Sequence, residues 1–296
     1  MKFSVLSVAG VVLALPLLVA AQDQDMDKNY QDLQEAVTKK DAALVKKFAV
    51  ATSKQVREEI AAPALDSDAE KAAWPKRLEY LKSVDLYTEY ALYATAIQGP
   101  AAVTLDLLST LEQQNPKSKY LEDAYGPYFK ALTETGAGAK ISAVAEKALA
   151  NNPENVDLLA VMAEGANSRS QIAQAGAYSQ RLIAALGKKP RPEKAGALAR
   201  AYLLSGLSRM AGQQWMLADQ DLRAALPSVR GSEASMSIVL FNLGVANYQL
   251  GKMLNSKGKV LEGIKFSEQA AQIKGPYQAQ AYSNVNAMKR EAERMR

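Results

Sequence analysis

The sequence contains no histidine and no cysteine among its 296 residues. These absences exclude disulfide bonds, Cys/His zinc sites and every nucleophile that depends on a Ser–His or Cys–His pair. Catalysis would have to use carboxylates, lysine, tyrosine or a Ser–Lys pair. Phosphate-binding loops of the G-x-x-x-x-G-K-[ST] or G-x-G-x-x-G type are also missing. We therefore expect neither an enzyme nor a protein with a cofactor or a metal site.

The chain also lacks a large excess of one charge. Its net charge of +5 comes from 36 basic and 31 acidic residues, which are mostly interleaved. The densest basic clusters, Gly187–Lys194 and Lys289–Arg296, are short and contain glutamate. A nucleic-acid groove needs clustered lysine and arginine, so we expect no nucleic-acid partner. The 48% of hydrophobic residues is enough for a packed core, and the abundance of Ala, Leu, Gln, Lys and Glu favours helix.

One long hydrophobic run is present, from Phe3 to Ala21, after a single lysine. Small residues at Val19 and Ala21 suit a signal peptidase, so residues 1–21 are predicted to be a signal peptide cleaved between Ala21 and Gln22. The mature protein would then be periplasmic or secreted, without stable membrane insertion. The alternative is an uncleaved anchor, because the run is just long enough to span a bilayer.

Prolines indicate an internal repeat. Pro116, Pro153, Pro190 and Pro227 lie 37 residues apart in every case, and Gly99 and Gly136 each precede the next of these prolines by the same distance. Apolar residues at helical spacing lie between these markers. Proline prevents a helix from continuing, and glycine permits a tight corner. Each repeat is therefore predicted to be two antiparallel helices, with a glycine at the turn inside the pair and a proline after it.

The predicted fold class is all-α, in four segments. The signal peptide is followed by an N-terminal helical segment and linker over 22–75, in which Asp32–Ile60 forms one helix or a helical hairpin. The repeat array covers 76–276, and a polar capping helix covers 277–296, because a stack of repeats needs a polar end.

Two stretches carry a family resemblance. "LGVANYQLGK", Leu243–Lys252, resembles the first helix of a tetratricopeptide (TPR) repeat, with a small residue at Gly244 and an end at Gly251. "GIKFSEQAAQIKGP", Gly263–Pro276, and "GAKISAVAEKALANNP", Gly138–Pro153, resemble the second helix. The period is longer than in the family, and Asn247 stands where a tyrosine is usual.

The resemblance implies a right-handed α-solenoid of TPR-like helix pairs whose first helices line a concave groove. It places the candidate partner-binding residues at Tyr202, Arg209, Phe241, Val245 and Tyr248. The implied function is an exported scaffold or adaptor that binds a protein or peptide partner in the cell envelope. The sequence leaves the partner and the oligomeric state open.

Three alternatives stay open. "NPKSKYLEDAYGPY", Asn115–Tyr128, also resembles a segment of outer-membrane or septal assembly factors of the TPR class, although the cysteine of a lipid anchor is missing. A carboxylate-dependent helical hydrolase would need two converging acids, and no such pair stands out. A purely structural spacer would have no soluble partner.

Three smaller motifs need an explanation. Ser256 and Lys259 form an S-x-x-K, which would be catalytic only with further motifs that are absent. The alternating acids of "DQDMD", Asp23–Asp27, lack the glycine and final acid of a calcium loop. The tyrosines at positions 80, 87, 90 and 93 form a helical stripe, which is either helix packing or an aromatic wall for a peptide or glycan.

Overall fold

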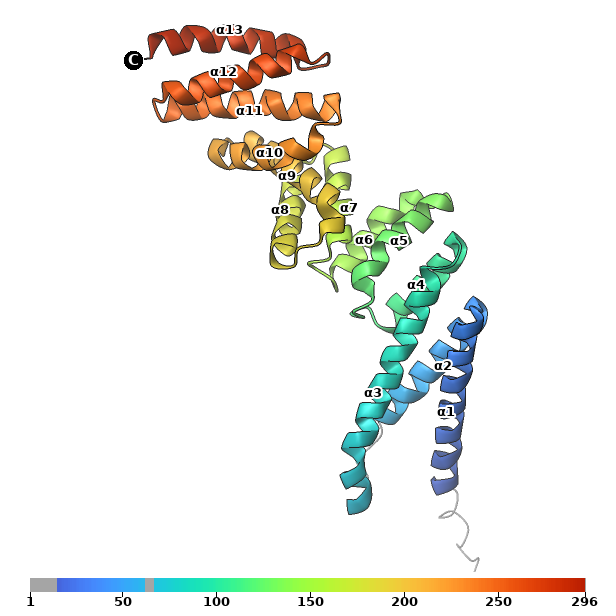
Figure 1. Cartoon of the computed structure of the whole chain (residues 1–296). Coiled ribbons are helices and arrows are strands. Elements are labelled where there is room, and N and C mark those ends of the chain that lie inside the picture. Colours follow the sequence, from blue (N-terminus) through green and yellow to red (C-terminus); the bar gives the residue numbers. More distant parts are fainter. Residues whose placement is uncertain (1–14, 62–66, 296) are drawn as a thin grey trace, which may run out of the picture. The chain divides into compact units, whose positions relative to one another are not determined.

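The protein is all-α, as predicted. The computed structural model describes residues 15–61 and 67–295, and these ranges contain thirteen α-helices, two short 3₁₀ turns and no strand (Figure 1). The helices are α1 (Leu15–Lys39), α2 (Ala42–Ile60), α3 (Asp68–Ala96), α4 (Ala101–Gln114), α5 (Leu121–Glu134), α6 (Ile141–Leu149), α7 (Val156–Ser168), α8 (Ile172–Lys188), α9 (Ala195–Ala211), α10 (Trp215–Val229), α11 (Glu233–Met253), α12 (Lys257–Gln272) and α13 (Gln278–Arg294).

The chain forms two compact units that divide between Lys140 and Ile141. Unit 1 contains α1 to α5, and unit 2 contains α6 to α13. The division lies inside the array that the sequence predicts for residues 76–276. Within each unit, every helix packs mainly on the helices next to it in the chain, which is the arrangement of stacked helical hairpins.

Unit 1 begins with a hairpin of α1 and α2, on which α3 packs. The sequence left one helix or a hairpin open for Asp32–Ile60, and the structure has the hairpin. Helix α3 begins at Asp68, where Ser67 and Glu70 form a reciprocal capping box. Pro75 therefore lies inside α3, and the predicted boundary between 75 and 76 falls within a helix.

Unit 2 contains the hairpins α7/α8, α9/α10 and α11/α12, and α13 packs on α12. Figure 1 shows α11, α12 and α13 as three adjacent helices that run in alternating directions. Helix α13 occupies the place of the predicted capping helix.

Five of the turns between helices share one backbone geometry. One or two positions after the preceding helix ends, a residue has a left-handed conformation: Lys40 (φ 56°), Gly136 (φ 75°), Ser170 (φ 58°), Gln213 (φ 56°) and Asn255 (φ 48°). The next amide then donates back into the helix, as from Gln171 to the Ala166 carbonyl at 2.9 Å. This is the Schellman ending of a helix, which satisfies carbonyls that the helix leaves free. The same turn geometry thus recurs along the chain, although only Gly136 and Asn255 have residue types that the geometry favours.

The predicted markers are partly correct. Pro116, Pro153 and Pro190 lie between helices, as expected, but Pro227 lies inside α10, which ends at Val229. Gly251 also lies inside its helix, because α11 continues to Met253 and Asn255 makes the turn.

Glycines at helix crossings confirm the expected close packing of α11 on α12. A Cβ added to Gly263 would lie 2.8 Å from the Gly244 carbonyl oxygen and 2.9 Å from the Tyr248 amide nitrogen. A Cβ on Gly251 would lie 2.8 Å from the Val260 amide nitrogen. These distances are too short for any side chain, so the two backbones approach each other only because the crossing residues are glycine.

Most of the predicted signal peptide lies outside the described residues. Helix α1 starts at Leu15 and runs through the predicted cleavage site between Ala21 and Gln22. Among the helices that the structure describes, none is both long and apolar enough to cross a membrane.

Candidate functional site

Two of the predicted groove residues, Tyr202 and Arg209, lie on α9. The Arg209 guanidinium is 3.2 Å from the Asp221 carboxylate of α10, and it donates to the Leu217 carbonyl at 3.3 Å. Tyr202 is half-buried against the cluster of apolar residues between α9, α10 and α11. Both residues therefore hold α9 against its neighbours.

The other three predicted residues lie on α11. Phe241 is buried, and its ring stacks on that of Tyr277 with centroids 4.8 Å apart. Val245 is half-buried in the same cluster. Tyr248 is half-buried against α12 and α13, and the Lys252 ammonium lies 5.5 Å from its ring centre.

The structure does not bring these five residues together on one open face. Four of them belong to three different apolar clusters, each of which forms where consecutive helices meet, and Arg209 is paired with Asp221. The TPR-like spacing selected side chains that pack between helices. Positions at helical spacing lie on one face of a helix, and here that face contacts the neighbouring helix.

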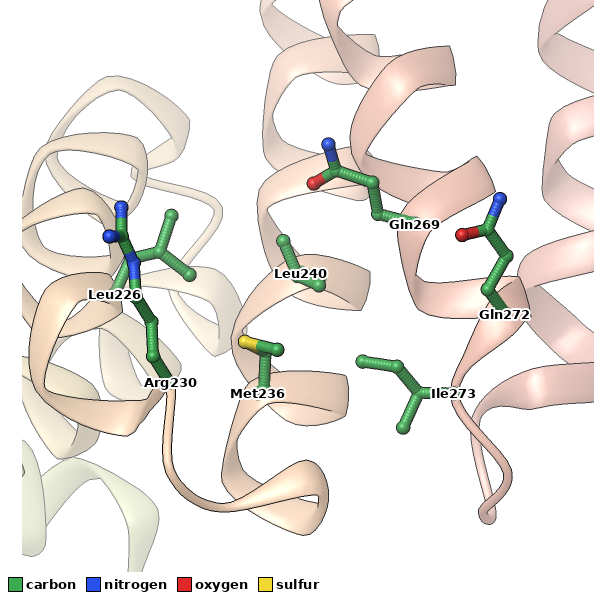
Figure 2. A pocket seen from close by; sticks show the side chains of 7 residues that line it. All are labelled: Leu226, Arg230, Met236, Leu240, Gln269, Gln272 and Ile273. Atoms are coloured by element: carbon green, nitrogen blue, oxygen red, sulfur yellow. The ribbon is translucent and has the colours of Figure 1, made fainter.

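A pocket of about 330 Å³ opens on unit 2 beside Phe241, and we call it the unit 2 pocket. Helices α10, α11 and α12 supply its lining, together with the residues that end α10 and α12 (Figure 2). The lining residues are Leu226, Arg230, Met236, Leu240, Gln269, Gln272 and Ile273. Its volume lies at the lower end of the range for ligand pockets, which suits one or two side chains of a bound peptide.

The walls of the unit 2 pocket are apolar. Leu240 is buried, while Leu226, Met236 and Ile273 are half-buried and pack on the same cluster as Phe241. The pocket is therefore an uncovered part of the core between α11 and α12, which can accept an apolar side chain from outside.

Polar groups surround this apolar floor. Gln269 and Gln272 are exposed neighbours on α12, and Arg230 is exposed just after the end of α10. Figure 2 shows both amides and the guanidinium around the apolar side chains. Amides can donate to and accept from a peptide backbone, and a guanidinium binds a carbonyl or a carboxylate. The arrangement fits a peptide that inserts an apolar residue.

These residues were not predicted from the sequence, although their spacing along the helices indicates that they share faces. The lining consists largely of pairs four positions apart, Leu226 with Arg230, Met236 with Leu240 and Gln269 with Ile273, and each pair lies on one face of a helix. The TPR resemblance drew attention to the first helices of the pairs, whereas this pocket takes most of its residues from α10 and α12.

A polar network lies between α10, α11 and α12. Asn247, which is fully buried, donates to Asp219 at 2.6 Å and accepts from Lys259 at 3.2 Å. Arg223 binds Asp219 at 2.9 Å and Glu262 at 2.6 Å. Asn247 thus links three helices through side-chain bonds to α10 and α12.

Burial changes the pKa of Asp221, the acid that binds Arg209. Removal of the carboxylate from water raises its pKa, whereas Ser205 and Arg209 beside it act in the opposite direction. In unit 1 the buried Glu89 accepts from Asn115 and from Ser118, each at 2.7 Å. Each buried acid thus has its own structural partners.

The smaller motifs have structural explanations. Ser256 caps α12 by accepting from the Lys259 amide, so the S-x-x-K is a helix start. Asp27 accepts from the Tyr80 hydroxyl at 3.1 Å, while the side chains of residues 23–25 lie outside the described part. Within residues 26–61 and 67–295, no group of three or more acids could hold a metal ion.

Comparison with known protein families and with curated proteins gives no match to this chain.

Proposed function

We propose that this chain is an exported scaffold of right-handed, TPR-like helix pairs, which binds a protein or peptide partner in the cell envelope. The observation that carries the proposal is the unit 2 pocket, where Leu226, Met236 and Ile273 form an apolar floor under a rim of amides and one guanidinium. The stacked hairpins support it, because rigid helix pairs present such sites without reorganisation.

The partner would insert an apolar side chain between α11 and α12. Its backbone would bind the amides of Gln269 and Gln272, and a carbonyl or carboxylate would bind Arg230. This mode matches the recognition of short segments by helical grooves, in which an apolar anchor supplies affinity and polar groups set the orientation.

Two of the alternatives, the envelope assembly factor and the hydrolase, have less support. The segment that resembles envelope assembly factors is used inside unit 1, where Asn115 and Ser118 bind Glu89. A carboxylate-dependent hydrolase needs two acids in one cleft, but Asp221 and Glu89 lie in different units, each with its own partners.

The experiment places a photo-crosslinking amino acid at position 269 of the full chain in intact cells. A covalent adduct with a defined segment of an envelope protein is expected. The same adduct should form with a crosslinker at position 272 and should be lost when Arg230→Glu is added. A crosslinker at the exposed position 280, on α13 and outside the pocket, is the matched control.

Adducts that form equally at 269 and 280, or that persist with Arg230→Glu, would contradict partner binding at this pocket. Hydrolysis of envelope polysaccharide by the purified chain would overturn the scaffold proposal itself. Fractionation tests export separately, because a full-length chain retained in the inner membrane would contradict cleavage between Ala21 and Gln22.

A further inference from the structure

Unit 1 contains a continuous chain of tyrosine rings. Tyr87 of α3 contacts Tyr30 of α1, with ring centres 5.4 Å apart, and Tyr90, at 5.9 Å. Tyr90 in turn contacts Tyr120, at 5.8 Å, and Tyr120 stacks on Tyr93 at 5.7 Å. The stripe predicted from the sequence is thus extended by Tyr30 and Tyr120, which come from other helices. Most of these rings are half-buried between helices, as the packing alternative expects.

Among these five contacting tyrosines, Tyr90 is the most exposed, at 43%, and it also forms a wall of a cavity. We call this the unit 1 cavity, and its volume is about 460 Å³. It lies where the hairpin turn from α1 to α2 meets the turn from α3 to α4. Its lining is Val37, Thr38, Lys40, Ala42, Tyr90, Ala94, Thr95, Gln98, Gly99, Pro100 and Val103.

The unit 1 cavity is lined by apolar residues and by one positively charged side chain. Lys40 is the single charged residue among its lining residues, and its ammonium makes no ion pair with any described residue. The nearest charges along the chain are engaged: Lys39 binds Glu35 at 2.6 Å, and Asp41 accepts from the Leu44 amide at 3.0 Å. No acid on the cavity wall therefore competes for Lys40.

The backbone at Lys40 explains why the lysine stands beside the cavity. Its φ of 56° belongs to the helix ending that Ser170, Gln213 and Asn255 also adopt, and the Asp41 amide closes this turn by donating to the Ala36 carbonyl at 3.1 Å. The turn therefore fixes the backbone of Lys40 at the edge of the cavity, and glycine would adopt the same φ with less strain.

We propose that unit 1 binds an acidic peptide segment of a partner protein. An aromatic or large apolar side chain of the segment enters the cavity and packs on Tyr90 and Val103. A carboxylate of a neighbouring residue pairs with Lys40, while Thr95 and Gln98 bind the peptide backbone. The site is separate from the unit 2 pocket and does not depend on it, so the chain would hold two peptide segments at once.

A peptide fits this cavity better than a glycan does. Sugar hydroxyls would find side-chain acceptors only in the oxygens of Thr38, Thr95 and Gln98, because none of the residues that line the cavity is a carboxylate, and a neutral sugar would leave the Lys40 charge unpaired. An unpaired ammonium beside an apolar floor instead complements an acid next to an apolar residue. Lys119 extends the basic character along the tyrosine chain, because its ammonium lies 5.1 Å from the centre of the Tyr120 ring.

The test uses the full chain with Gln269→Trp, which fills the mouth of the unit 2 pocket, so that binding there does not interfere. A phage library of random twelve-residue peptides is selected on this protein, and the recovered peptides are measured by fluorescence anisotropy. Peptides with an aromatic or large apolar residue next to Asp or Glu are expected, and their binding should weaken with salt.

Two pairs of variants separate binding from folding. Lys40→Gly removes the charge and relieves the strain, so it should weaken binding by about tenfold and raise Tm. Ser170→Gly relieves the same strain at a unit 2 turn, so it should raise Tm without changing binding. Tyr90→Ala should also weaken binding, whereas Tyr282→Ala, at an exposed position of α13, should not.

Peptides that bind equally well to the parent and to Lys40→Gly would overturn the proposal. Recovery of no peptide, or only of peptides without an acid, would also overturn it. So would binding of a neutral chitin or cellulose oligosaccharide that Tyr90→Ala abolishes and Lys40→Gly leaves unchanged. None of these outcomes bears on the unit 2 pocket, which the crosslinks at position 269 test.

Discussion

The Asn247 amide donates to the Asp219 carboxylate at 2.6 Å from a position with no solvent exposure. The same amide nitrogen donates to the Leu243 carbonyl at 2.9 Å. Replacement of Asn247 by alanine would remove one bond from each of Asp219 and Lys259, which would keep only Arg223 and Glu262, respectively, as partners in the network. We expect Asn247→Ala to lower the free energy of unfolding by about 2 kcal/mol, measured by urea denaturation.

Gln249→Ala is the matched control for this prediction, because Gln249 lies on the same helix and is half-buried outside the network. It should change stability by less than about 0.5 kcal/mol. Equal effects of the two substitutions would show that the network between α10, α11 and α12 does not stabilise the fold.

The crossing of α11 and α12 gives a second prediction. Gly263→Ala would place a Cβ 2.8 Å from the Gly244 carbonyl oxygen, so the two helices would have to separate. We expect a loss of about 3 kcal/mol from this overpacking. Gly187→Ala, on α8 with no atom near the added Cβ, should instead stabilise the protein by about 1 kcal/mol. Thermal denaturation of both variants tests the contrast, and a neutral Gly263→Ala would contradict the packing.

The shared turn geometry gives a third prediction. Gln213 has a φ of 56°, and glycine adopts this conformation more easily. Gln213→Gly should therefore stabilise the protein by about 1 kcal/mol, and Gly136→Ala should destabilise it by a similar amount. Opposite shifts of Tm are the expected result. A destabilising Gln213→Gly would mean that the glutamine side chain itself is needed at this turn.

A fourth prediction concerns pH. Burial opposes ionisation of Glu262, but the bonds from Lys259 and Arg223 outweigh it and lower the pKa of Glu262 below its ordinary value of 4.5. The carboxylate therefore stabilises the fold above that value, and the contribution is lost as the pH falls through the folded-state pKa.

Glu262→Gln should accordingly be less stable than the natural chain at pH 7, and the difference should shrink as the pH falls below 4.5 and through the lowered folded-state pKa of Glu262. Glu293→Gln, at an exposed position of α13, should show no such dependence. Urea denaturation at a series of pH values measures both. A difference that is constant with pH would contradict the role of the charge.

The sequence was sufficient for the fold class and for much of the helix pairing. Three of the four equally spaced prolines do lie between helices, because a residue without an amide hydrogen disfavours continuation of a helix, although Pro75 and Pro227 lie inside helices. Gly244 and Gly263 indicated the close crossing of α11 and α12, since small residues are what such a crossing requires. These properties depend on local geometry, which the order of residues determines.

The sequence was not sufficient for the turns that lack glycine. Lys40, Ser170 and Gln213 adopt the same left-handed conformation as Gly136, although their residue types do not favour it. Asn255 adopts it too, and asparagine tolerates it better than most residues. Packing of the two helices of each hairpin outweighs the local strain at these positions, so only the tertiary structure identifies them.

The candidate sites also depended on tertiary structure. The TPR resemblance placed Phe241 and Tyr248 in a groove, but such spacing does not distinguish a side chain that faces a groove from one that faces the next helix, and both are packed between helices. Whether an apolar face is covered depends on how the hairpins stack. The unit 2 pocket and the unit 1 cavity are two places where that stacking leaves apolar surface open, and contacts between different helices determine where they lie.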